Sequence, residues 1–200
     1  MNLFEQFEEN LNTGKLAWLN QPKSWRVADN RLIVDTLPNS NFFNDPETED
    51  TVATGHYLYT IARGDFCMMT RVEIGMVGMF DSGCLLAMSD LHHWGKLCFE
   101  NWLDEPSIVS VTTNGRSDDC PSLRIGKVSP YLRIVRSGDC FCMHYSLNAQ
   151  DWTIIRYFRL SLPQEIKVGV LAQSPVGDGC RVIFDRFELE QRPIASAKML

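Results

Sequence analysis

The sequence lacks the features that would place the protein in several common functional classes. Its 19 Lys and Arg residues are scattered and outnumbered by 25 Asp and Glu, which leaves a formal net charge of −6. Because nucleic-acid phosphates are bound by clustered cations, no nucleic-acid partner is expected. No apolar run reaches the length of about 18 residues that a membrane-spanning helix needs, so no membrane partner is expected.

Cysteine is present without the pattern of a disulfide framework. The 7 cysteines form an odd set, most of them lie inside apolar strand-like segments, and the chain has no Asn-x-Ser/Thr sequon. Reduced, buried cysteines behave as small hydrophobic residues. The segment 1–10 is acidic, the reverse of the basic start of a signal peptide. We therefore expect a reducing compartment, most simply the cytoplasm.

Catalytic, cofactor and metal motifs are also missing. The chain contains no Gly-x-Ser-x-Gly elbow and no Walker-type loop, and "GDGCRV" lacks the third glycine of a dinucleotide loop. His92 and His93 are adjacent, so their rings diverge, and Cys140 and Cys142 have no second pair at zinc-ligand spacing. The sequence predicts no catalytic residue, no cofactor and no metal.

What the sequence does contain is a long series of alternating, strand-like segments separated by turn residues. No segment after residue 15 has a sustained helical period. A further hairpin is expected around Asp29 and Asn30, which separate two alternating segments. Strands without crossover helices pair antiparallel, so the pattern predicts a β-sandwich or barrel, in one domain spanning 1–200. The main predicted strands are 57–62, 66–75, 84–89, 96–101, 108–113, 131–137, 140–147, 154–160, 166–174 and 180–190.

The alternation predicts which side chains face the core. In the strand 96–101, Leu97 and Phe99 point to one face, and Lys96 and Glu100 point to the other. In the strand 108–113, the same rule predicts that Val109 and Val111 face the core. The acidic, proline-containing segment 38–55 reads as a long surface loop whose two phenylalanines need cover.

Five segments, spread in order over nearly the whole chain, carry more specific motifs: "GKLAWLNQPKSW", "HHWGKLCFEN", "VSVTTNGRSDDC", "YLRIVRSGDCFCMHYSLNAQDW" and "VGVLAQSPVGDG". They resemble the regulation-of-enolase family of the concanavalin A-like lectin/glucanase superfamily. The resemblance implies an all-β, two-sheet antiparallel jelly-roll sandwich with one concave and one convex sheet. It also implies a link to sugar metabolism, without an established catalytic activity.

Glu100 is the first candidate site residue, because glycans bind on the concave sheet in this superfamily. Its hydrolases place carboxylates on one strand with the spacing Glu-x-Asp-x-(x)-Glu, since a retaining glycosidase needs two carboxyl groups about 5–5.5 Å apart. Here the strand begins with Lys96 and ends with Glu100, so the first two carboxylates are missing. An ion pair between these two residues is the competing structural interpretation. Asp118 and Asp119 are read as turn-capping residues.

The remaining candidates are residue types that suit a sugar or a sugar phosphate. The planar fork of an arginine suits hydroxyls and phosphates, a histidine donates to a hydroxyl, and sugar rings stack on tryptophan. A cross-strand ion pair and a half-buried histidine are the structural alternatives. The hypothesis requires Lys96, Glu100, Arg133 and His144 to project into one shared trough. The predicted ligand-binding residues are Lys96, Glu100, Arg133, His144, Trp94, Gln173 and Asp81.

Three functions follow from this pattern. The first is a non-catalytic domain that binds a small carbohydrate or sugar phosphate and is linked to the regulation of carbohydrate metabolism. The second is a glycan-acting enzyme, a hydrolase or isomerase, that uses Glu100 with Asp81 or Asp118 as its partner. The third is a protein-interaction module that regulates a metabolic enzyme through a sheet edge or the segment 38–55, and it predicts an exposed apolar patch.

Overall fold

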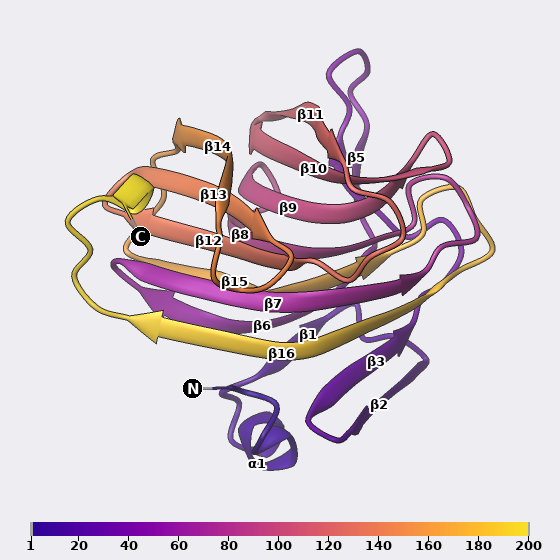
Figure 1. Ribbon diagram of the computed structural model, residues 1–200, viewed down its shortest axis with the longest axis horizontal. Helices are drawn as coiled ribbons and strands as arrows, with labels where there is room; N and C mark the ends of the chain where they lie inside the picture. The colour runs from indigo at the N-terminus through magenta and orange to yellow at the C-terminus, as the bar shows by residue number, and fades with distance from the viewer. Residues whose placement is uncertain (1, 200) are drawn as a thin grey trace.

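The computed structural model describes residues 2–199 and consists of two large antiparallel sheets with short connecting turns (Figure 1). One of them, called the β9 sheet below, has the strand order β1-β6-β15-β8-β9-β10-β11. Its strands are β1 (Ala17–Leu19), β6 (His56–Arg63), β15 (Glu165–Gln173), β8 (Ser82–Asp90), β9 (His93–Trp102), β10 (Glu105–Asn114) and β11 (Arg116–Arg124).

The other sheet, called the β12 sheet, has the strand order β14-β13-β12-β7-β16-β3-β2. A separate two-stranded hairpin and two short helices complete the chain. The strands of the β12 sheet are β14 (Thr153–Arg159), β13 (Cys140–Ser146), β12 (Tyr131–Ser137), β7 (Phe66–Gly75), β16 (Arg181–Gln191), β3 (Arg31–Asp35) and β2 (Ser24–Ala28). The hairpin is β4 (Phe42–Asn44) with β5 (Thr51–Ala53), and the helices are α1 (Phe7–Asn12) and η1 (Ala197–Met199).

The main core lies between the two sheets. Leu97 and Phe99 of β9 pack there with Leu132 and Ile134 of β12, as the alternation predicts. The Asp29–Asn30 hairpin is also present, and both of its turn residues have positive φ angles, as a tight hairpin turn requires. The predicted all-β, two-sheet antiparallel sandwich is confirmed.

The β9 sheet is unusual because its second face is buried as well. A second apolar cluster, which includes Phe42, Cys98 and Leu171, covers that face. The side-chain assignment for β10 was wrong: Val109 and Val111 belong to this second cluster, because they pair with Cys98 and Lys96. Sequence alternation alone cannot separate the two faces when both are apolar.

Two segments read as loops are partly β-structure. The segment 38–55 contains the β4–β5 hairpin, and Asn44 fastens it to the sheet by donating from its side chain to the carbonyl oxygens of Leu91 and Gly115. The polar segment after Asn114 is β11, an edge strand with a proline at position 121. An edge strand tolerates proline because one of its sides needs no backbone donor.

Candidate functional site

The candidate site is a pocket on the second face of the β9 sheet, beside the β4–β5 hairpin. Its cavity has a volume of about 290 Å³. The strand register places Gln173 opposite Ser82, and Ser82 opposite Glu100. Four residues before Glu100, and therefore on the same face, Lys96 pairs with Val111, which pairs with Asp119. One polar row and one row with charged ends thus cross the sheet beneath the pocket.

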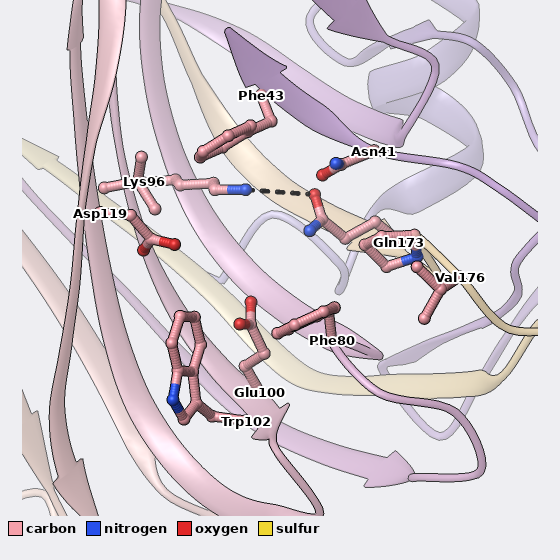
Figure 2. A pocket seen from close by; sticks show the side chains of 11 residues that line it. Asn41, Phe43, Phe80, Lys96, Glu100, Trp102, Asp119, Gln173 and Val176 are labelled. Atoms are coloured by element: carbon pink, nitrogen blue, oxygen red, sulfur yellow. Dashed lines mark hydrogen bonds between the residues drawn. The ribbon is translucent and has the colours of Figure 1, made fainter. Parts of the chain in front are cut away.

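Lys96 is almost fully buried, with 2% of its surface exposed. Its ammonium group donates to the Phe42 carbonyl oxygen at 2.8 Å. It also donates to Gln173 Oε1 at 3.4 Å (Figure 2). It also lies 5.7 Å from the centre of the Trp94 ring. The long side chain therefore joins the β4–β5 hairpin to the β9 sheet. The predicted ion pair with Glu100 is not formed.

Glu100 points into the cavity between the side chains of Trp102 and Phe80 (Figure 2). Only 5% of its surface is exposed. Burial raises the pKa of its carboxyl group to about 8, although Lys96 opposes the shift and Asp119 adds to it. None of the ion pairs formed among residues 2–199 includes this carboxyl group. Glu100 is therefore a buried acid that is held in its neutral form at pH 7.

Three aromatic side chains line the pocket from three different elements. Phe43 comes from β4, Trp102 from the end of β9 and Phe80 from the loop before β8. The rings of Phe80 and Trp102 lie 5.5 Å apart at 66°. Phe80 has a φ angle of 65°, a left-handed conformation that costs a bulky residue about 1–3 kcal/mol. The surrounding loop must hold this conformation in place.

Asp81 supplies that support and does not line the pocket. One of its carboxylate oxygens accepts hydrogen bonds from the backbone N–H groups of Val77 and Gly78, at 2.9 and 2.7 Å. The other oxygen accepts one from the Ser174 hydroxyl at 2.6 Å. Its side chain is completely buried. We therefore assign Asp81 the task of shaping the loop that presents Phe80.

Trp94 is also a supporting residue. It is completely buried, its indole N–H donates to the Leu91 carbonyl at 3.2 Å, and Phe42 packs edge-on against its ring. The stacking surface expected from Trp94 is therefore inaccessible to a ligand. Trp102, which shares its strand and face, lines the pocket instead.

Arg133 and His144 lie on the other sheet, so the expectation of one shared trough is wrong. They face each other on β12 and β13, on the surface of the β12 sheet that points away from the core. The Arg133 guanidinium stacks on the Trp152 ring at 4.1 Å. Burial, and then Arg133, lowers the pKa of His144 to about 4. Of the seven predicted residues, Lys96, Glu100 and Gln173 line the pocket together.

Asp119 is an acidic pocket residue that was not among the predicted ligand contacts. It sits at the rim of the pocket on β11, and partial burial raises its pKa while Lys96 opposes the shift. Asp118 points the other way and pairs with Arg156 at 2.9 Å. The second carboxyl group near Glu100 is thus neither Asp81 nor Asp118. Alternation did not reveal it, because Asp119 pairs with Val111, which the sequence assigned to the core face.

The comparisons with known proteins support the assignment of the fold and the family. A family model described as "Protein of unknown function (DUF1349)" matches residues 18–192. "Regulation of enolase protein 1" from Saccharomyces cerevisiae is 24% identical over 182 residues, which cover 90% of this chain and 92% of that protein. The resemblance found in the sequence is therefore confirmed.

Two solved structures show the same fold. The first, described as a functionally unknown protein from Saccharomyces cerevisiae, has a TM-score of 0.84 at 23% identity, covering 90% of this chain and 97% of that one. The second is the carbohydrate binding module CBM66 from Bacillus subtilis, with a TM-score of 0.57 at 12% identity and coverages of 88% and 96%. Among the described residues, no helix is long and apolar enough to cross a membrane, and no group of three metal-ligating side chains occurs.

Proposed function

Because the chain belongs to a family described only as "Protein of unknown function (DUF1349)", we propose its function from the pocket: a non-catalytic domain that binds a small carbohydrate. The observation that carries the proposal is the combination of aromatic rings and buried polar groups in one cavity of about 290 Å³. Small-ligand sites are mostly apolar, with a few polar groups that fix orientation.

Each part of the pocket suits a sugar. The C–H face of a sugar ring packs on Trp102 or Phe80, as apolar ligand groups do on aromatic surfaces. Gln173 and Glu100 offer hydrogen-bond partners on the floor, and Asp119 offers a further acceptor at the rim. The likeness in fold to a carbohydrate binding module agrees with this proposal.

A role in regulation through another protein is the second candidate, and exposed apolar side chains favour it. Val77, Leu103 and Val176 expose 79%, 59% and 57% of their surfaces. They lie in three different loops, which join β7 to β8, β9 to β10 and β15 to β16. The name of the yeast relative points to such a role for that protein. Neither candidate requires catalysis, and the cytoplasmic location remains a prediction.

The proposed function is tested by titrating the protein with a panel of monosaccharides and disaccharides while following thermal unfolding. A ligand present at about 100 times its Kd stabilises the folded state by about 2.7 kcal/mol, which is easily measured as a rise in Tm. Trp102→Ala is expected to weaken binding at least tenfold, because it removes the stacking surface. Trp152→Ala is the matched control, since Trp152 lies on the β12 sheet. Equal losses in both variants, or no binding by the unmodified protein, would contradict the proposal.

A further inference from the structure

The pocket contains a buried acid that forms no ion pair within the part of the chain described, although Lys96 acts on it electrostatically from within the same pocket. Buried carboxyl groups are normally paired with a cation or strongly hydrogen-bonded, because an isolated buried charge is costly. Glu100 takes part in none of the ion pairs formed by residues 2–199. It nevertheless points into an open cavity rather than into the core (Figure 2). A ligand that enters this cavity therefore meets the carboxyl group directly.

The other charges in the pocket favour a cationic ligand group over an anionic one. Lys96 is the single cationic side chain among the described lining residues, and its ammonium group is already held by Phe42 and Gln173. Asp119 adds a second acid at the rim. A phosphate placed here would face two carboxyl groups and one lysine whose donors are largely engaged. The sugar phosphate considered in the sequence analysis is therefore disfavoured.

The aromatic side chains point the same way. Phe80 and Trp102 stand on either side of the Glu100 carboxyl group, and Phe43 lies across the cavity (Figure 2). The faces of aromatic rings attract cations, with about 0.5–2 kcal/mol for each good contact. An acid flanked by two rings is thus complementary to an ammonium group attached to an otherwise polar molecule.

We propose that the ligand is an amino sugar, with its ammonium group against Glu100 and its hydroxyl groups directed to Gln173 and Asp119. This inference rests on the proposed function and narrows its ligand class. It does not require a covalent step.

Binding of an amino sugar has a consequence that binding of a neutral sugar lacks. In the empty pocket the Glu100 carboxyl group is protonated at neutral pH, because burial raises its pKa to about 8. Lys96 and Asp119 are the other charged groups that shift this pKa, and they act in opposite directions. An ammonium ion bound against Glu100 favours the carboxylate, so the proton passes to the buffer. Binding of an amino sugar should therefore release close to one proton at about pH 6.5.

The experiment is calorimetric titration at about pH 6.5 in two buffers of different ionisation enthalpy. The ligands are glucosamine, galactosamine and mannosamine, each with its parent hexose, its N-acetyl derivative and its 6-phosphate. One amino sugar is expected to bind at least about tenfold more tightly than its three analogues, a preference of about 1.4 kcal/mol. Its apparent binding enthalpies in the two buffers should differ by close to the difference between the two buffers' ionisation enthalpies, as the release of one proton requires.

The outcomes separate this inference from the function on which it rests. A neutral hexose or a sugar phosphate that binds as tightly as the amino sugar overturns the inference and leaves the carbohydrate-binding function standing. Buffer-independent binding of the amino sugar also overturns it. Failure of every sugar to bind overturns both.

Two variants test the role of the acid. Glu100→Gln keeps the size of the side chain and removes its titratable acid, so it is expected to abolish both the preference for the amino sugar over its parent hexose and the proton release. Asp118→Asn is the control, because Asp118 points away from the pocket and pairs with Arg156. If Glu100→Gln retains both the preference and the proton release, another group holds the ammonium ion and the inference is wrong.

Discussion

Two polar patches, one on each sheet, are produced by the same strand alternation but have very different surroundings. Lys96 and Glu100 follow the alternation of β9, and Arg133 and His144 follow that of β12 and β13. All four side chains are at least 92% buried, since their exposed fractions are 2%, 5%, 8% and 1%. On the β9 sheet the patch faces a cavity that Phe80, Trp102 and Phe43 line. On the β12 sheet the Trp152 ring lies directly on the guanidinium.

The two patches differ in whether the charges around them are compensated within the described chain. A hollow of about 490 Å³ does lie beside Arg133, but its two acids, Glu188 and Glu190, already pair with Arg186 and Arg192. Its charges are thus compensated within the chain. In the pocket of the β9 sheet, by contrast, the Glu100 carboxyl group has no such pair within the described chain.

The two patches also respond to pH in opposite directions. Each contains a buried titratable group whose neutral form is favoured by burial: Glu100, with its pKa raised to about 8, and His144, with its pKa lowered to about 4. Ionisation of Glu100 at high pH therefore reduces the stability of the protein, and ionisation of His144 at low pH does the same.

The largest effect is expected from disrupting the packing of the β4–β5 hairpin on the β9 sheet. Phe42→Ala removes a ring that is 1% exposed and packs on Tyr57 and Trp94, so it should reduce the free energy of unfolding by about 3–5 kcal/mol. The adjacent Phe43→Ala is the control: Phe43 lines the cavity, so sugar binding should fall while stability changes by less than about 2 kcal/mol. Urea unfolding measures the stability of both variants, and titration with the sugar measures their binding. Equal destabilisation by the two variants would mean that the hairpin is fixed in some other way.

Glu100→Gln should stabilise the protein at high pH. The native state holds the Glu100 proton up to a pKa of about 8, against 4.5 for the ordinary carboxyl group. The native state therefore binds more protons between these pH values, and stability falls as the pH rises through this range. The variant has no such proton to lose. Relative to the unmodified protein, its free energy of unfolding at high pH should be greater by a few kcal/mol, since each pKa unit corresponds to about 1.4 kcal/mol. Unfolding curves of both proteins between about pH 4 and 9 measure the difference. A constant difference across that range would contradict the prediction.

His144→Leu should remove a loss of stability that occurs on acidification. With its pKa lowered from 6.5 to about 4, the native state binds fewer protons than the unfolded state within this range. Stability contributed by neutral His144 is complete above 6.5 and is lost as the pH falls towards 4. We expect the variant to gain about 2–3 kcal/mol relative to the unmodified protein at the acidic end, at about 1.4 kcal/mol per pKa unit. An identical acid profile in the two proteins would show that His144 does not titrate as described.

The smallest effect is expected outside both patches. Asp118→Asn breaks an ion pair in which the Asp118 side chain is 69% exposed. Exposed pairs contribute about 0–1 kcal/mol, so the free energy of unfolding should change by less than about 1 kcal/mol and sugar binding should not change. A large effect on binding would show that β11 presents Asp118 to the pocket.

The fold was predictable from the sequence because its signals are local. Alternating apolar side chains located all ten main strands, and the Asp29–Asn30 turn located a hairpin. The edge strand β11 escaped detection because it has few apolar residues and a proline. The two faces of β10 were predicted the wrong way round. Val109 and Val111 are apolar, yet they lie on the second face of a sheet that is buried on both sides.

The site was only partly predictable. Lys96, Glu100 and Gln173 were found because one sheet contains all their strands. Phe80 and Asp119 were not selected, because one lies in a loop of unusual conformation and the other on the unrecognised edge strand. Asp81 and Trp94 were predicted to contact the ligand, but neither lines the pocket, and hydrogen bonding and packing give them supporting roles.

The sequence by itself determined the strands, their alternation and the polar character of certain faces, because side-chain direction in a strand depends only on its neighbours along the chain. Only the tertiary structure decided that β9 and β12 belong to different sheets, and hence that Glu100 and Arg133 never meet. Strand order depends on contacts between residues far apart in the chain, and alternation contains no information about them.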